Sequence, residues 1–391
     1  MWKGEGSTVI AITNTKLVME DGIIWDGRLV IDGDRILRVG WACEIGIPDG
    51  VQVIDAMGRY TTPGFIDIHC HGAGSANFNE DPLGNAAHFL RHGTTTVLPT
   101  LYMNLTAQQM IDGARRIMAA SREGAGRIIG GLYMEGPYMG AFGSVQDGIV
   151  WNRPIDESAY RPLVDQIAPW VRVWAIDPSR ENIDSFMRYV KQCNPAAIFA
   201  LGHSHATAAE CRRVADLGVR VQTHHGDSGK VPGRAQGTVG AGCDEFTLYN
   251  PDMYAELICD EVGVHVVPDM IKMVVRTKGV ERMILISDSM CDKYGYKNNE
   301  AEGIVYGPDL NYDDRGWLAG SHLTLDNACR NLMAHTGYGL CHAIRFVSVN
   351  PARMLGIFDE VGSLAPGKRA DLLIMDDAVH IEKVMLRGEI Q

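Results

Sequence analysis

The sequence lacks the features that mark membrane, secreted and nucleic-acid-binding proteins. None of its apolar runs reaches the roughly 18 residues that a membrane-spanning helix needs. Its first 22 residues hold no apolar segment of the signal-peptide kind. The net charge of −12 argues against nucleic acid or an anionic membrane as the main partner. We therefore expect a globular protein that binds neither.

Paired cysteines are also missing. The nine cysteines are scattered along the chain, and none forms a C-x-x-C pair. An odd number of cysteines without a secretion signal indicates free thiols in a reducing compartment. We therefore predict a cytoplasmic protein whose cysteines mostly serve as small buried apolar residues.

The composition that is present suits a sizeable globular protein. The chain has 391 residues, of which 46% are hydrophobic and 21% charged, so it can bury a large core. This length fits one large α/β domain with a small one, or two ordinary domains.

The pattern of apolar residues separates strand-rich ends from a middle of alternating strands and helices. Residues 1–62 alternate apolar and polar side chains around Asp-Gly and Gly-Asp turns, and residues 357–391 have the same texture. Between them, apolar strands are followed by amphipathic helical segments such as 182–193 and 206–218. The expected strands of the middle part are 64–69, 94–100, 128–135, 171–177, 197–203, 219–224, 262–267 and 282–288.

Eight strand–helix units in this order predict an α/β fold, a (β/α)8 barrel of the TIM type. We expect the barrel to occupy residues 63–356. Residues 1–62 and 357–391 would together form a small β-sandwich domain from both termini.

The segment GFIDIHCHG, residues 64–72, places two histidines one residue apart after an apolar run. Alternate side chains of a strand face the same way, so His69 and His71 would point to one side and Cys70 to the other. Two converging imidazoles indicate a metal site. Two hydrogen-bonded histidines at a strand end would produce the same short motif.

Further metal-binding types of side chain recur at the ends of the expected strands. The carboxyl ends of the strands carry the active site of a (β/α)8 barrel. Imidazole and carboxylate groups suit a divalent transition metal, first of all Zn²⁺, with Fe²⁺, Co²⁺ and Mn²⁺ as alternatives and one or two ions. The strand-end residues are His69, His71, Glu135, His203, His224 and Asp288.

The chemistry of such a site is hydrolysis. A divalent metal polarises a carbonyl and brings the pKa of a bound water towards about 7. Asp288 would take the proton of that water and later give it to a leaving amine. An amide or a related bond is therefore the expected target.

Several segments along the chain carry a resemblance to a known family. They are PGFIDIHCHG, GLYMEGPYMG, LGHSHATA, VQTHHG, LISDSM, LAGSHLTLDNACRNL and GSLAPGKRADLLI. In these segments the chain resembles the amidohydrolase superfamily and, within it, the N-acetylglucosamine-6-phosphate deacetylases. The resemblance covers nearly the whole chain.

The resemblance implies a role for each residue of the site. Glu135, His203 and His224 would hold the principal metal, and Asp288 would be the general acid and base. His69 and His71 would help to hold a second metal, with Glu135 as the bridge. Other branches use a carbamylated lysine after the fourth strand, but here that strand ends WAIDPSR without a lysine.

The resemblance also implies substrate-binding residues and a homodimer. His265 matches a sugar-binding histidine, and Arg234 matches an arginine that contacts the phosphate. His225 and Gln146 are further candidates for contact with the substrate. His224 rather than its neighbour His225 is taken as the ligand because of the TH match.

Two departures from the family pattern bear on the substrate. The chain continues THHGDSGKV, where Asp227 would repel a phosphate unless Lys230 or Arg234 offsets its charge. The stretch YMGAFGSVQDG lacks the histidine that the family carries after its EGP motif.

We therefore predict deacetylation of an N-acetylated amino sugar, N-acetylglucosamine 6-phosphate or a close relative. The first alternative is hydrolysis of an unphosphorylated N-acyl sugar, an N-acyl amino acid or a cyclic amide. The second is a non-catalytic barrel that serves as a binding module.

Overall fold

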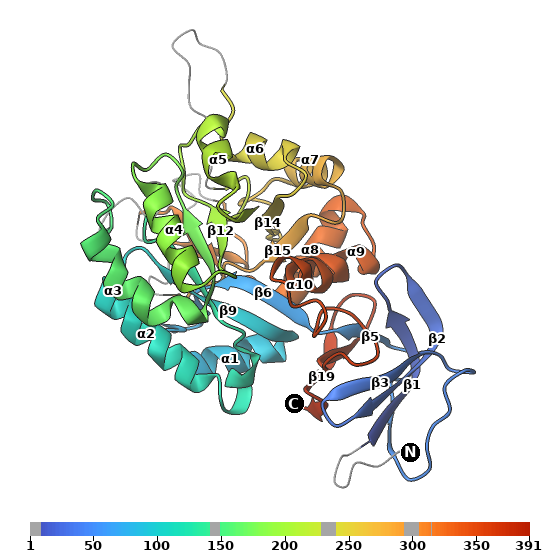
Figure 1. Ribbon diagram of the computed structural model, residues 1–391. Coiled ribbons are helices and arrows are strands. Elements are labelled where there is room, and N and C mark those ends of the chain that lie inside the picture. The colour runs from blue at the N-terminus through green and yellow to red at the C-terminus, as the bar shows by residue number, and fades with distance from the viewer. Residues whose placement is uncertain (1–8, 141–148, 228–239, 293–304, 314) are drawn as a thin grey trace.

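A sheet of eight parallel strands forms the centre of the molecule (Figure 1). The computed structural model describes residues 9–140, 149–227, 240–292, 305–313 and 315–391. The strands of this sheet are β6 (Phe65–Cys70), β9 (Thr94–Tyr102), β10 (Leu132–Glu135), β11 (Val171–Ile176), β12 (Ile198–Leu201), β13 (Val219–Gln222), β14 (Tyr254–Ile258) and β15 (Met283–Ile286).

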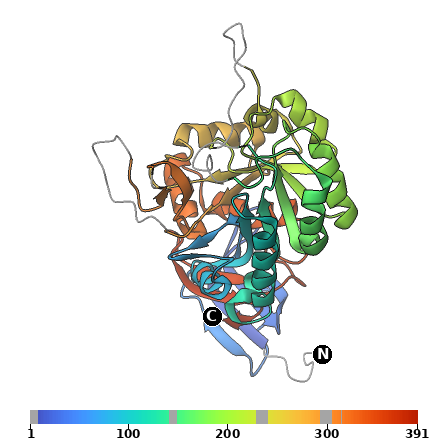
Figure 2. The same ribbon diagram turned by 90° about the vertical axis from the view of Figure 1, so that its left-hand side faces the viewer.

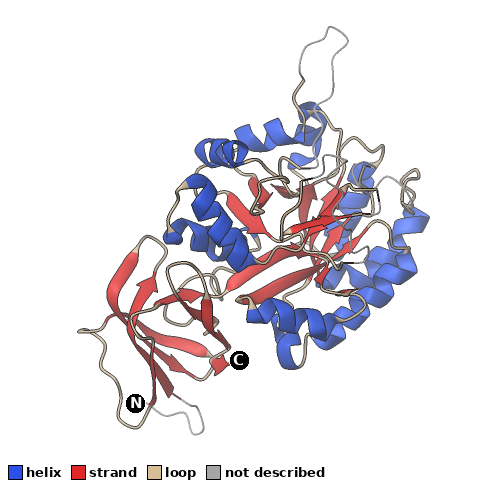
Figure 3. Ribbon diagram, turned by 180° about the vertical axis from the view of Figure 1, so that it is seen from behind, coloured by secondary structure: helices blue, strands red, loops and turns tan. Residues whose placement is uncertain are grey.

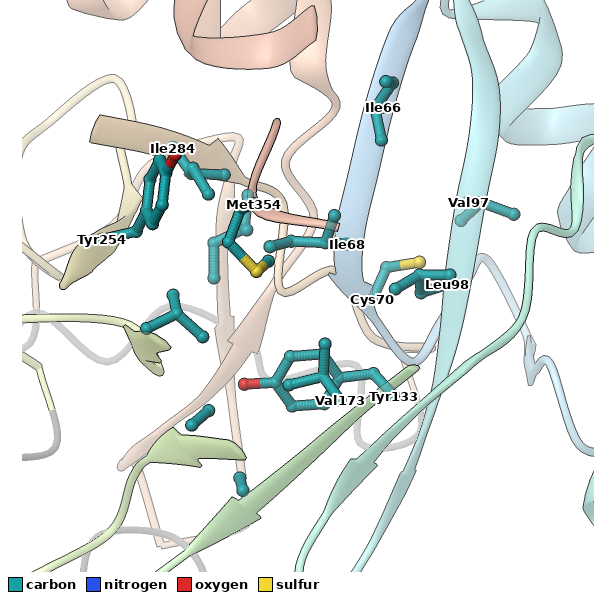
Figure 4. Packing of buried hydrophobic residues seen from close by; sticks show 14 of the residues in the cluster. Ile66, Ile68, Cys70, Val97, Leu98, Tyr133, Val173, Tyr254, Ile284 and Met354 are labelled. Atoms are coloured by element: carbon teal, nitrogen blue, oxygen red, sulfur yellow. The ribbon is translucent and has the colours of Figure 1, made fainter. Parts of the chain in front are cut away.

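The strands follow one another around the sheet in chain order, from β6 and β9 to β15. The two outer strands meet where the backbone N–H of Asp288 donates to the carbonyl oxygen of His69 (2.9 Å). Both faces of the strands are buried, which is typical of a parallel sheet covered by helices. Ile66, Ile68 and Cys70, for example, lie along β6 among other buried apolar side chains (Figure 4). The expected (β/α)8 barrel is confirmed.

Helices pack around the outside of the barrel (Figure 3). Their apolar residues recur with helical spacing: in the segment 183–193, Ile183, Phe186, Met187 and Val190 are all fully buried. The helices are α1 (Pro82–Arg91), α2 (Ala107–Ala120), η1 (Gly124–Ile128), α3 (Glu157–Ile167), η3 (Ala168–Trp170), α4 (Ile183–Cys193), α5 (Ala208–Ala215), α6 (Cys243–Tyr249), α7 (Pro268–Lys278), α8 (Leu325–Thr336), α9 (Leu340–Ile344), η5 (Arg345–Val349) and α10 (Asn350–Met354).

The expected seventh strand at 262–267 is wrong, because the strand is β14, several residues earlier. Residues 262–267 follow the buried Asp260, whose carboxylate accepts hydrogen bonds from the backbone N–H groups of residues 263–265. Gly263 has a φ of +76°, which a strand does not allow. The apolar composition of this segment is therefore typical of a strand, but its backbone N–H groups donate to the Asp260 carboxylate and not to a neighbouring strand.

Strands from both ends of the chain form a second, mixed sheet beside the barrel (Figure 2). Its β1 pairs with β2, β4 and β5, and β5 pairs in turn with β18 from the C-terminal segment. These strands are β1 (Val9–Val18), β2 (Ile23–Asp32), β3 (Arg35–Trp41), β4 (Gln52–Asp55), β5 (Tyr60–Pro63), β18 (Leu372–Met375), β19 (Ile381–Leu386) and β20 (Glu389–Ile390). Two hairpins lie outside both sheets: β7 (Gly72–Ala73) pairs with β8 (Ala76–Asn77), and β16 (Leu310–Tyr312) pairs with β17 (Leu318–Ser321).

The small sheet has an apolar core of its own. Ile12, Ile31 and Ile36 from the first strands are buried in one cluster with Leu372 and Met385 from the last ones. A small β domain built from both termini is therefore confirmed, and the residue limits proposed for the domains stay a prediction.

Two further observations bear on the expectations from composition. No helix among the described residues is both long enough and apolar enough to cross a membrane. All nine cysteines are free, and most of them are buried.

Outside the barrel mouth, the buried carboxylate of Asp326 links the start of α8 to the partly exposed His92 at the end of α1. The carboxylate of Asp326 lies 3.3 Å from Nδ1 of His92 and 3.0 Å from the guanidinium of Arg330. Burial alone would raise the pKa of Asp326, but the hydrogen bonds and charges of its partners lower it to about 2. The ionised carboxylate therefore stabilises the folded state.

Replacing Asp326 with asparagine is expected to lower the free energy of unfolding by about 2 kcal/mol at pH 7. The pKa in the folded state lies below the ordinary value of 3.8. The contribution is therefore complete above about pH 5 and is lost as the pH falls towards 2. Denaturant titrations of both proteins at pH 7 and at pH 3 measure this difference. Equal stabilities at pH 7 would contradict the prediction.

Candidate metal centre

Six side chains with metal-binding groups lie together at the carboxyl ends of the barrel strands. His69 is in β6, and His71 follows that strand directly. Glu135 is the last residue of β10. The other three each lie two residues beyond the end of a strand, namely His203 after β12, His224 after β13 and Asp288 after β15.

These last three residues share an unusual backbone conformation. The φ angles of His203, His224 and Asp288 are +42°, +26° and +46°. Residues other than glycine adopt positive φ rarely and at some cost in energy. At each position the chain leaves its strand by this turn, and the side chain lies at the mouth of the barrel.

Glu135 lies at the centre of the cluster. Its Oε1 is 2.9 Å from Nε2 of His203 and 3.2 Å from Nε2 of His224. Its Oε2 is 3.2 Å from Nε2 of His71 and 3.9 Å from Nε2 of His69. The two carboxylate oxygens thus serve two different pairs of histidines.

The cluster contains two groups of three possible ligands. His69, His71 and Glu135 have ligand atoms within 4.8 Å of one another, and so do Glu135, His203 and His224. All five residues are buried. The two groups share Glu135, so this arrangement has room for one or two ions.

Asp288 lies beside the first group. Its Oδ1 is 3.4 Å from Nε2 of His69 and 3.3 Å from Nε2 of His71. Its backbone N–H donates to the carbonyl oxygen of His69, which holds the residue against β6. The carboxylate therefore faces the centre of the cluster.

The charges of the cluster suit a bound cation. Burial would lower the pKa of His71 and of His224, but the nearby carboxylates Glu135 and Asp288 raise the first to about 9 and the second to about 10. The pKa of Glu135 is well below its ordinary value, although burial opposes this, because three histidines hydrogen-bond to it. Buried carboxylates thus attract positive charge, and a metal ion would replace protons on the rings.

The donor atoms fit a divalent metal as well. Nε2 of His69 and Oδ1 of Asp288 are buried and have no hydrogen-bond partner among the described residues, although they lie only 3.4 Å apart. Buried polar atoms normally have a partner. Imidazole nitrogens and carboxylate oxygens are ligands of divalent transition metals.

His265 and His225 lie outside the group of possible ligands. Nδ1 of His265 is 3.1 Å from Oδ2 of Asp260, and its Nε2 is 3.2 Å from the carbonyl oxygen of Gly320. Nδ1 of His225 lies 2.6 Å from Oε1 of Gln222. The structure therefore places His224, and not His225, beside Glu135.

The roles of the substrate-binding candidates stay predictions. His265 and His225 are buried near the cluster. Gln146 and Arg234 lie outside the described residues.

Three residues of this region escaped the sequence analysis. Glu256 in β14 is fully buried and lies 3.4 Å from Nδ1 of His69. Tyr133 stacks on the ring of His69, with 4.5 Å between the ring centres. Asp67 accepts a hydrogen bond from the backbone N–H of His69. Asp67 lies two residues before His69, so the alternation of side chains along the strand could have predicted that it shares a face with His69 and His71.

Comparison with known proteins places the chain in a family. The model of the amidohydrolase family matches residues 60–390. An N-acetylgalactosamine-6-phosphate deacetylase of Escherichia coli O157:H7 is 30% identical, over 96% of this chain and 97% of that protein. An N-acetylglucosamine-6-phosphate deacetylase of Bacillus subtilis is 26% identical, over 97% of this chain and 96% of that protein.

Solved structures show the same architecture. The N-acetylglucosamine-6-phosphate deacetylase of Pasteurella multocida superimposes with a TM-score of 0.84 at 23% identity, over 98% of this chain and 99% of that one. A mutant of the Mycobacterium smegmatis deacetylase, in complex with N-acetyl-D-glucosamine-6-phosphate, has a TM-score of 0.81 at 25% identity and covers 99% of both chains. The chain therefore belongs to the amidohydrolase family, in the branch that contains the amino-sugar-phosphate deacetylases.

Proposed function

We propose that this chain is a metal-dependent hydrolase that removes the acetyl group of an N-acetylated amino-sugar phosphate. The substrates that we propose are N-acetylglucosamine 6-phosphate and its galactosamine epimer. The observation that carries the proposal is the position of Glu135 between two histidine pairs, with Asp288 beside one of them. Full-length similarity to deacetylases of both sugars supports the same reaction.

Glu135, His203 and His224 would hold the principal ion, and His69 and His71 would hold a second one together with Glu135. A divalent metal bound there polarises the acetyl carbonyl and lowers the pKa of a water molecule. We propose Zn²⁺ as the metal because of the imidazole and carboxylate donors, with Fe²⁺, Co²⁺ and Mn²⁺ as alternatives.

Asp288 would transfer the proton. Its carboxylate faces the cluster and is held by its backbone hydrogen bond to His69. It would accept a proton from the attacking water and deliver it to the amide nitrogen as the C–N bond breaks. The products are acetate and the free amino sugar phosphate.

His265 and Arg234 would bind the sugar and its phosphate, as the family resemblance implies. His225 and Gln146 are proposed as further substrate contacts. Two more parts of the proposal rest on the sequence: a homodimer follows from the family resemblance, and a location in the cytoplasm follows from the cysteine content.

Kinetics with matched substrates test the function. We expect kcat/KM to be at least about tenfold higher for a 6-phosphorylated N-acetyl sugar than for the same sugar without phosphate. Tenfold is about 1.4 kcal/mol, near the low end of what a hydrogen bond to a charged group contributes. Arg234→Gln is expected to reduce this preference.

The same panel separates the alternatives. It includes both phosphorylated epimers, unphosphorylated N-acyl sugars, N-acyl amino acids and cyclic amides. A preference for any of the last three classes would replace the proposed substrate. Absence of stoichiometric metal from the purified protein, with no hydrolysis of any compound, would favour a binding module instead.

A further inference from the structure

Glu256 is a charged side chain in the middle of an otherwise apolar strand. It lies in β14, and none of its surface is exposed. A buried carboxylate is costly unless its charge and its oxygens are satisfied. Oε1 of Glu256 has no hydrogen-bond partner among the described residues. One of the two carboxylate oxygens therefore has no hydrogen bond to offset its burial.

The other oxygen of Glu256 contacts both groups of possible metal ligands. Oε2 accepts a hydrogen bond from Nδ1 of His69 (3.4 Å) and one from the backbone N–H of His224 (3.4 Å). The carbonyl oxygen of Glu256 accepts a third hydrogen bond, from the backbone N–H of His225 (2.7 Å). One residue of β14 thus contacts His69 and also holds the segment that carries His224.

The contact with His69 determines which ring nitrogen is available. A carboxylate only accepts hydrogen bonds, so the proton of a neutral His69 ring lies on Nδ1. Nε2 then keeps its lone pair, and it is this atom that faces Glu135 and Asp288. Tyr133 stacks on the ring, and its hydroxyl is 2.7 Å from Oγ1 of Thr223. The orientation of the ring is therefore held from its edge and from its face.

We propose that Glu256 is a positioning residue for the metal centre. It acts through His69: it directs Nε2 of that ring into the cluster and adds a negative charge behind it. A carboxylate that holds a ligating imidazole in this way raises its basicity, and its loss typically weakens metal binding by about 10- to 100-fold. This inference rests on the proposed function only for the presence of the metal.

Zn²⁺ binding by the metal-free full-length protein tests the proposal. In Glu256→Gln the amide has nearly the shape of the carboxylate but no charge. We expect Zn²⁺ to bind about 10- to 100-fold more weakly at the site that contains His69, as measured by calorimetric titration and by metal content after dialysis. The midpoint of thermal unfolding of the metal-free variant is expected to stay close to that of the parent, because the amide oxygen can still accept the hydrogen bonds from His69 and from the backbone N–H of His224.

If Glu256 had a purely structural role, both the thermal unfolding and the Zn²⁺ affinity of Glu256→Gln would differ from these expectations. The metal-free variant would then unfold at a lower temperature, and its Zn²⁺ affinity would not change. Asp326→Asn is the matched control, since it breaks a contact of similar length between a buried carboxylate and a partly exposed imidazole, away from the cluster. We expect it to lower stability and to leave Zn²⁺ affinity unchanged.

A double-mutant cycle tests whether Glu256 acts through His69. In a His69→Gln background, the change Glu256→Gln is expected to have no further effect on Zn²⁺ affinity. Should Glu256→Gln fail to fold, Glu256→Asp retains the charge one methylene further from the ring and is expected to bind Zn²⁺ with intermediate affinity. Unchanged Zn²⁺ affinity in whichever of these two variants folds would overturn the inference. Failure of the Zn²⁺-loaded parent to hydrolyse any N-acetyl sugar would instead refute the proposed function.

Discussion

Replacing Asp288 with asparagine is expected to lower kcat for deacetylation by about 10²- to 10⁴-fold, the usual contribution of a general acid or base. The amide cannot accept the proton of the attacking water or pass it to the leaving nitrogen. The fold should tolerate the change, because asparagine adopts positive φ more readily than most residues and Asp288 has a φ of +46°. Its backbone N–H still reaches the carbonyl oxygen of His69.

Steady-state kinetics and metal analysis of the same preparation measure this effect. Metal content is expected to stay at the parent level, since neither group of possible ligands includes Asp288. Asp326→Asn should keep its full turnover at a temperature where it remains folded. Near-parental activity of Asp288→Asn would show that another group transfers the proton.

Replacing Glu135 with glutamine is expected to weaken metal binding by more than about 100-fold, beyond the range seen for residues that only support a ligand. Its two oxygens serve both histidine pairs. The amide has one oxygen and carries no charge, so it cannot bridge both groups. Turnover should fall with the metal content.

Metal content after dialysis against a weak chelator, together with circular dichroism, tests this prediction. The variant is expected to keep the secondary structure of the parent. Retention of stoichiometric metal in a folded Glu135→Gln protein would remove Glu135 from the ligand set. High concentrations of Zn²⁺ should restore part of the activity if weak binding alone is responsible.

The strand-end residues were predictable because their positions follow from simple periodicity. His69 and His71 share one face of a strand, and the other ligand candidates follow apolar runs that have the length of barrel strands. Carboxyl ends of parallel strands meet at one end of a barrel. The structure brings Glu135, His203 and His224 together there, as expected.

The seventh strand was misplaced for a local reason, and Glu256 was missed as a result. The segment 262–267 has the apolar, β-branched composition of a strand, but Asp260 binds its backbone. Because that segment was predicted as the strand, YAELI at 254–258 was not, and Glu256 was therefore not placed in the barrel. The left-handed turns at His203, His224 and Asp288 were not predictable either, because nothing in the local sequence marks them.

The pairing of β5 with β18 affects the order of events during synthesis. β5 ends at Pro63, whereas its partner β18 begins at Leu372, after the whole barrel. At about 5–20 residues per second, a ribosome needs roughly 15–60 s to make the stretch between them. Throughout that interval the edge of β5 has no partner, and an unpaired edge invites contact with other chains. The nascent N-terminal strands thus stay open to pairing with other chains until β18 has been made and has paired with β5.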